Sequence, residues 1–208
     1  MCGIIGYSGP KEPLPILIGG LSRLEYRGYD SAGVAILDGK KLTIEKKEGK
    51  LQVLKDHLED KKIIGNIGIG HTRWATHGIP NNINAHPHSD NQKEFAIIHN
   101  GIIENYAEMK DDLLKENYIF ESDTDTEVVA VELGNQWTGR LLETVTNVAK
   151  KLDGTYALVV TSTKEPGTIV AGRMMSPLVL GVGEGETFLA SDSACLLYTS
   201  PSPRDPHL

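Results

Sequence analysis

Cys2-Gly3-Ile4-Ile5-Gly6-Tyr7 opens the chain directly after the initiator methionine. An apolar run this short predicts a buried strand. Chain ends normally fray, so a terminus built into a strand needs an explanation. Because cysteine is small, methionine aminopeptidase can remove the methionine before it, and we expect the mature chain to begin with Cys2.

An N-terminal cysteine combines the two parts of a nucleophilic catalyst. It offers a thiol and an α-amino group whose ordinary pKa of roughly 7.7–8.0 lets it act as a base near neutral pH. No separate catalytic histidine is then required. Taken alone, a cysteine in second place is usually incidental, so a catalytic role for Cys2 needs support from the rest of the chain.

Composition limits the class of protein. The 208 residues, 39% of them hydrophobic, fit one domain with a substantial core. A formal net charge of -7 argues against a nucleic-acid partner, which would need a basic face. No apolar run approaches the roughly 20 residues that span a bilayer, and the start lacks the features of a signal peptide. We therefore expect a cytoplasmic protein without membrane or nucleic-acid partners.

Hydrophobic periodicity predicts strands at both ends of the chain with most helices between them. This order is typical of two sheets covered by helices. The expected helices are 13–24, 51–58, 105–116, 128–137 and 141–152, and the expected strands are 4–7, 34–37, 42–46, 67–71, 95–99, 155–162, 168–171, 178–182 and 188–190.

The segment from Thr72 to Lys93 has almost no periodicity and is rich in Gly, Pro, Asn and His. An irregular loop this long in a compact domain is usually functional or disordered, and its Arg and Trp favour function. His86 and His88 raise a metal site as an alternative, but no Cys or acidic residue lies at ligand spacing. We predict no metal and no cofactor.

A cluster of Ser, Thr and acidic residues, 121–127, precedes the helix expected at 128–137. Such residues cap helices and stabilise the helix start without any substrate. Asp125 alone is therefore interpreted as a cap, and Arg73 alone as a surface arginine. Their occurrence together with Cys2 and Asn100-Gly101 favours a binding site instead.

Several motifs occur in one order along the chain and together resemble a known family. They are Cys2-Gly3-Ile4-Ile5-Gly6, the segments 24–33, 71–78 and 99–105, and Ser122 to Glu127. In these motifs the chain resembles the class II, N-terminal-nucleophile glutamine amidotransferases, and among them the glutamine–fructose-6-phosphate aminotransferases. The resemblance implies an α/β (α+β) fold, a four-layer αββα sandwich of the N-terminal-nucleophile hydrolase type.

The resemblance also implies catalytic roles. Cys2 would attack the side-chain amide of L-glutamine, and its own amino group would pass the proton to the leaving ammonia. The Asn100 side chain and the Gly101 N–H would form the oxyanion hole, where removing one donor costs about 10²–10³ in rate.

Further residues would bind the substrate. The resemblance implies that the planar fork of Arg73 takes the α-carboxylate of glutamine, with Thr76 and His77 completing that end of the pocket. Asp125 would pair with the α-ammonium group. Trp74 belongs to a segment that resembles the lid closing on bound glutamine, and Arg27, in the loop facing the terminus, would support the nucleophile.

The family enzymes contain two sugar-isomerase domains that bind fructose 6-phosphate and receive the ammonia, and this chain lacks them. We expect residues 1–194 to be a C-terminally truncated amidotransferase domain. Residues 195–208 depart from the family pattern and resemble a translated sequencing adapter, so we expect a non-native tail in which Cys195 has no function. Two alternatives stay open: the glutaminase domain of another class II amidotransferase, and an inactive glutamine-binding fragment.

Overall fold

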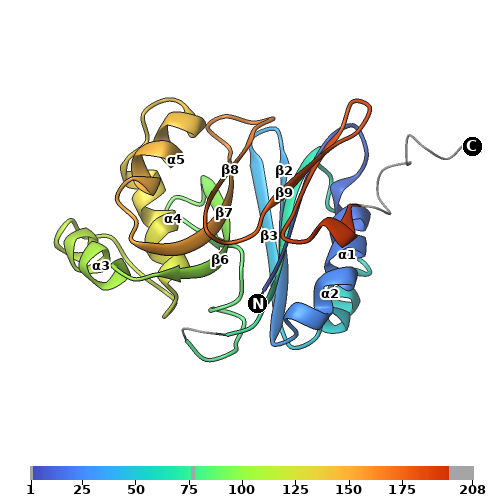
Figure 1. The fold of residues 1–208 in the computed structure, drawn as a ribbon, viewed down its shortest axis with the longest axis horizontal. Coiled ribbons are helices and arrows are strands. Elements are labelled where there is room, and N and C mark those ends of the chain that lie inside the picture. The colour runs from blue at the N-terminus through green and yellow to red at the C-terminus, as the bar shows by residue number, and fades with distance from the viewer. Residues whose placement is uncertain (1, 76–77, 197–208) are drawn as a thin grey trace, which may run out of the picture.

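The computed structural model describes residues 2–75 and 78–196. Within them, two antiparallel sheets lie face to face, and helices cover both outer faces (Figure 1). The first sheet has the order β3-β2-β4-β1-β10-β9 and the second has the order β5-β6-β7-β8. This arrangement confirms the expected four-layer αββα sandwich.

The first sheet is built from both ends of the described chain, so β1 lies between β4 and β10. Its strands are β1 (Gly3–Ser8), β2 (Ser31–Asp38), β3 (Lys41–Glu48), β4 (Ile67–Arg73), β9 (Val179–Val182) and β10 (Thr187–Ala190). Its outer face packs against α1 (Pro13–Leu24) and α2 (Leu51–Leu58).

The second sheet comes from the middle of the chain. Its strands are β5 (His88–Ser89), β6 (Phe95–Ile103), β7 (Gly154–Ser162) and β8 (Ile169–Met174). The helices on this side of the molecule are α3 (Tyr106–Lys115), α4 (Asp125–Asn135) and α5 (Leu141–Ala149). A short 3₁₀ helix, Glu25–Arg27 (η1), lies between α1 and β2, and a second, Ser193–Cys195 (η2), follows β10.

Strand alternation explains the three apolar layers. In β1, Ile5 and Tyr7 pack in the cluster under α1, whereas Ile4 packs between the sheets. In β6, Phe95 and Ile97 pack with the second set of helices, whereas Ala96 and Ile98 face the first sheet. The central strands β1 and β6 are therefore buried on two faces.

Two glycines in β4 let α1 approach the first sheet closely. A Cβ at Gly68 would lie 2.7 Å from Cδ1 of Leu17, and one at Gly70 would lie 3.2 Å from Cδ1 of Leu21. The helix expected over 13–24 is confirmed with the same bounds.

Other expected bounds were wrong. The strand expected to end at 99 continues through Asn100 and Gly101, because β6 keeps its pairing with β7 as far as Ile103. The helix expected from 128 begins at Asp125, because Thr124 caps it: the Thr124 side chain accepts a hydrogen bond from the Glu127 N–H. The segment expected to be wholly irregular contributes the end of β4 and the short β5.

The end of the described chain packs onto the domain. Cys195 is fully buried in the apolar cluster under α1, with Sγ 3.8 Å from the Gly20 carbonyl oxygen. The expected domain boundary after residue 194 stays a prediction, and most of the expected tail, 197–208, lies outside the described residues. Over the described ranges, no helix has the length and apolar character needed to cross a bilayer.

Candidate active site

Cys2 lies immediately before β1, at the end of β4. The pairing of Gly3 with Thr72 brings the thiol beside Trp74, whose backbone holds it on two sides. The Trp74 N–H donates to Sγ at 3.2 Å, and the thiol donates to the Trp74 carbonyl oxygen at 3.5 Å. Burial raises the pKa of the Cys2 thiol, and the Trp74 hydrogen bond lowers it by less. The thiol is therefore protonated near neutral pH and needs a base to become a nucleophile.

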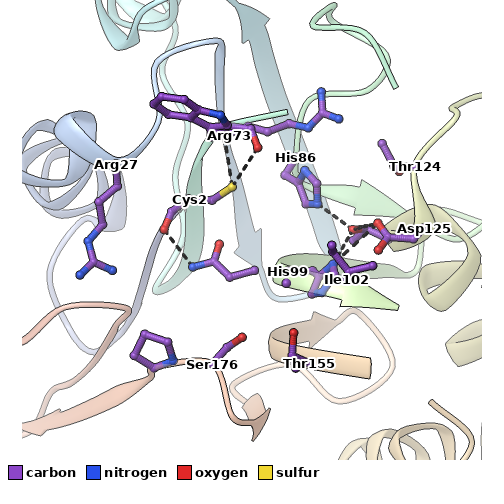
Figure 2. A pocket seen from close by; sticks show the side chains of 15 residues that line it. Cys2, Arg27, Arg73, His86, His99, Ile102, Thr124, Asp125, Thr155 and Ser176 are labelled. Carbon is purple, nitrogen blue, oxygen red and sulfur yellow. Dashed lines mark hydrogen bonds and ion pairs between the residues drawn. The ribbon is translucent and has the colours of Figure 1, made fainter. Parts of the chain in front are cut away.

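A pocket of about 360 Å³ opens in front of this thiol, and side chains from both sheets and from α4 line it (Figure 2). The pocket brings together every described residue that the sequence predicted for the site. They are Cys2, Arg27, Arg73, Trp74, Asn100, Gly101 and Asp125. Thr76 and His77, also predicted, lie outside the described residues.

Asn100 and Gly101 lie on β6, directly opposite the nucleophile. The Asn100 Nδ2 group donates to the Cys2 carbonyl oxygen at 3.0 Å. Gly101 has φ of +121°, and a Cβ there would lie 1.9 Å from the Thr155 carbonyl oxygen. Only glycine fits this turn of the backbone, so the residue type follows from geometry as well as from chemistry.

Asp125 is the first residue of α4 and is buried. Its Oδ2 atom accepts from the Ile103 N–H at 2.9 Å, and its Oδ1 accepts from the Thr126 hydroxyl at 3.3 Å. The cap of the helix is Thr124, not Asp125. The interpretation of Asp125 as a helix cap is therefore wrong, and a carboxylate is available at the pocket wall.

Arg73 ends β4 and is 3% exposed, so its interpretation as a surface arginine is also wrong. Its Nη2 group donates to the Gly78 carbonyl oxygen at 3.3 Å. Burial lowers the pKa of the guanidinium, and the nearby charge of Asp30 opposes this. An arginine stays charged under such a shift, so Arg73 supplies a cationic side chain to the pocket that also holds the Asp125 carboxylate.

Trp74 and Arg27 lie at the edge of the pocket. The Trp74 indole is about half exposed and meets the Tyr29 ring edge-to-face, with centroids 5.4 Å apart. The Arg27 guanidinium points away from the thiol (Figure 2) and forms an ion pair with Asp192 at 2.7 Å. It also donates to the Ser191 carbonyl oxygen at 3.4 Å. The roles predicted for both residues stay predictions.

Buried histidines lie beside these residues, and of them only His86 and His88 were considered from the sequence, as possible metal ligands. His86 and His99 both contact the Thr126 hydroxyl through a ring nitrogen, at 2.8 and 2.9 Å, next to Asp125 (Figure 2). The His71 ring stacks on His86 with centroids 4.4 Å apart. Strand alternation could have indicated His71, since it precedes Arg73 by two residues and so shares its face of β4.

A cysteine at the start of a central strand, facing a side-chain amide on a second stacked sheet, is the arrangement of an N-terminal-nucleophile amidotransferase. Residues 71–198 match a family model described as a glutamine amidotransferase domain. The chain belongs to this family of glutamine amidotransferase domains.

Two comparisons extend this result to individual proteins. The chain is 53% identical over 200 residues to the glutamine–fructose-6-phosphate aminotransferase (isomerizing) of Aquifex aeolicus, covering 96% of this chain and 34% of the relative. It is 51% identical over 197 residues to the enzyme of that name from Clostridium acetobutylicum, covering 95% of this chain and 32% of the relative. The chain therefore spans about a third of the length of these relatives.

A solved structure has the same fold. Glutamine phosphoribosylpyrophosphate amidotransferase from B. subtilis, complexed with ADP and GMP, matches with a TM-score of 0.82 at 29% identity. The match covers 94% of this chain and 43% of that one. This likeness confirms the fold class predicted from the sequence.

Proposed function

We propose that this chain hydrolyses the side-chain amide of L-glutamine to glutamate and ammonia. The observation that supports this most directly is the Cys2 thiol at the pocket with the Asn100 amide 3.0 Å from the Cys2 carbonyl oxygen. A nucleophile and a hydrogen-bond donor on two facing sheets suit attack on a carbonyl carbon, because the donor stabilises the oxygen that becomes negative.

The reaction runs in two steps. The Cys2 sulfur adds to the amide carbon while its proton passes to the base, and the C–N bond then breaks as the nitrogen receives that proton and leaves as ammonia. Water next attacks the thioester, releasing glutamate and the thiol. The base in this proposal is the α-amino group of Cys2, which requires removal of Met1, a residue outside the described part of the chain.

The ends of the substrate fit the charges of the pocket. Arg73 presents a cationic fork suited to the α-carboxylate, and Asp125 presents an anion suited to the α-ammonium group. Thr76 and His77 complete the carboxylate end in this proposal, and Trp74 forms part of a lid over bound glutamine.

We further propose that the ammonia serves the formation of glucosamine 6-phosphate from fructose 6-phosphate. The support is the identity of 50% or more to proteins named for that reaction, against 29% to the phosphoribosylpyrophosphate enzyme. The acceptor site would lie in the two thirds of the relatives that this chain does not match. The proposal places the protein in the cytoplasm, a reducing compartment in which Cys2 would stay a thiol.

Glutamate release from L-glutamine by the purified chain tests the proposal, with intact mass reporting the state of Met1. We expect release from chains that begin at Cys2 and none above background from Cys2→Ala. Cys195→Ala is the matched control, since this buried thiol lies under α1, away from the pocket, and should keep the activity. A folded chain that begins at Cys2 and releases no glutamate would be the inactive glutamine-binding fragment instead.

A further inference from the structure

We infer that His71 is a positioning residue, which holds the Asn100 side-chain amide in the orientation that directs its N–H₂ group at the nucleophile. The inference rests on the proposed function, because it assigns a purpose to the oxyanion donor named there. His71 lies on β4, on the side of the Asn100 side chain away from the pocket, and it does not line the pocket.

The hydrogen bonds around His71 leave its ring one arrangement. The Nε2 atom lies 3.0 Å from the His99 carbonyl oxygen and 3.0 Å from Oδ1 of Asn100. A carbonyl oxygen can only accept, so Nε2 must bear the proton. The His99 carbonyl group on β6 thus selects the tautomer of His71 on β4. In that tautomer Nε2 can only donate to Asn100, so the Asn100 atom that faces it must be an acceptor.

The fixed donor in turn orients Asn100. With Oδ1 turned to His71, Nδ2 faces the Cys2 carbonyl oxygen at 3.0 Å and donates to it. The reversed amide would set Nδ2 against the Nε2–H of His71 and Oδ1 against the Cys2 carbonyl oxygen, which places two donors together and two acceptors together. Both contacts are buried or nearly so, and unmatched polar groups there are costly.

The surroundings keep the ring neutral. His71 is 1% exposed, and burial lowers its pKa to about 3, so it does not titrate near neutral pH. Its other ring nitrogen, Nδ1, has no hydrogen-bond partner among the described residues, and the ring packs flat on His86 at 4.4 Å. A ring that neither contacts the substrate pocket nor titrates fits a structural donor better than an acid or base.

The kinetic test uses four variants of the full chain. We expect His71→Leu to lower kcat roughly 10- to 100-fold, less than the 10²–10³ typical for loss of an oxyanion donor, with KM unchanged. His71→Gln, which can present a donor in place of Nε2–H, should recover most of the loss. Because His71 acts through Asn100, the double variant His71→Leu/Asn100→Ala should be no slower than Asn100→Ala.

His57→Leu is the matched control. This histidine on α2 pairs with Glu45 away from the active-site pocket, so the same substitution should leave kcat and KM unchanged. Urea unfolding of each variant separates loss of positioning from loss of the fold. A double variant slower by the product of the two single effects would overturn the inference, as would a change in KM alone.

A spectroscopic measurement separates this inference from the proposed function. The ¹⁵N shifts of the His71 ring should show a neutral imidazole protonated at Nε2 between about pH 5 and 8, whether or not glutamine is hydrolysed. Absence of glutaminase activity with this tautomer would refute the proposed function and leave the arrangement of Asn100 intact. A ring protonated at Nδ1 would refute the positioning role even in an active enzyme.

Discussion

Gly101 satisfies two constraints at once, a backbone conformation with φ of +121° and contact with the neighbouring strand β7. We expect Gly101→Ala to lose about 1–3 kcal/mol of unfolding free energy through backbone strain. The total loss of unfolding free energy should exceed this strain, because the added methyl group would also clash with the Thr155 carbonyl oxygen. Glutamate release should fall as well, since Asn100 precedes this residue.

Gly167→Ala is the control for that prediction. Gly167 has φ of +94°, and beyond its two chain neighbours no described residue lies within 4 Å of a Cβ placed there, so only the strain is added. Urea unfolding of both variants measures the difference. Equal losses would mean that β7 moves aside at no cost, contrary to the prediction.

The residues of the site also show how far sequence reasoning reaches. Cys2, Arg73, Asn100 and Asp125 could be selected because the motifs that contain them resemble those of a known family, whose reaction suits the chemistry of each side chain. The role of His71 could not, because it depends on which ring nitrogen meets which oxygen across two sheets. Periodicity assigns a face to a residue but does not give atom-level contacts.

Among the elements, α4 both covers the second sheet and presents Asp125 to the pocket, so its N-terminus is a sensitive position. Thr124 caps it and also contacts His88 at 3.0 Å. We expect Thr124→Ala to cost about 1 kcal/mol of unfolding free energy. KM for glutamine should rise at the same time, because the first turn of α4 holds Asp125.

Two variants make that prediction specific. Thr124→Ser keeps the hydroxyl and should keep most of the stability and the wild-type KM. Thr146→Ala removes a hydroxyl that donates to the Leu142 carbonyl oxygen on the exposed side of α5, and it should change neither quantity by much. Steady-state kinetics together with thermal unfolding would check this. A Thr124→Ala protein with wild-type KM would show that the cap does not hold Asp125.

The elements were predictable where pattern and local chemistry agree. The apolar spacing of α1 led to the correct bounds, and the strands expected at 34–37 and 42–46 are present within β2 and β3, which are joined at Asp38-Gly39, where Gly39 has a positive φ of +53°. The continuation of β6 through Asn100-Gly101 was not predictable, because asparagine and glycine normally end a strand. There the pairing with β7 outweighs local preference.

At the scale of the whole molecule, two carboxylates fasten β10 to the N-terminal part of the chain. Glu186, just before the strand, contacts Lys11 at 2.9 Å and the Tyr7 hydroxyl at 3.1 Å. Asp192, just after it, accepts from the Ala194 N–H, from the Tyr26 hydroxyl and from Arg27. These donors lower the pKa of Glu186, with Lys11 the largest cause, and the pKa of Asp192, with the Ala194 N–H the largest.

A lowered carboxyl pKa in the folded state adds stability above the unfolded-state pKa of about 4, and that stability is lost as the pH falls through the folded pKa. We therefore expect the unfolding free energy to decrease as the pH is lowered below about 4. The double variant Glu186→Gln/Asp192→Asn should be less stable at pH 7 and show a shallower acid slope. Urea unfolding across this pH range checks both expectations.

Asp112→Asn is the control for the acid slope. Asp112 pairs with Lys115 on the surface of α3, where both side chains are largely exposed, and such pairs contribute little. This variant should keep the wild-type slope. An unchanged slope in the double variant would show that other groups govern acid unfolding.

The central position of β1 has a consequence for synthesis on the ribosome. Ile5 pairs with Ala190, so a ribosome adding 5–20 residues per second needs roughly 10–40 s to make the second neighbour of β1 after β1 itself. During that interval β1 can pair with β4 but leaves its other side open, as the edge strand of a nascent sheet. The strand that follows the nucleophile therefore needs protection from wrong pairing, such as a chaperone gives, while translation continues.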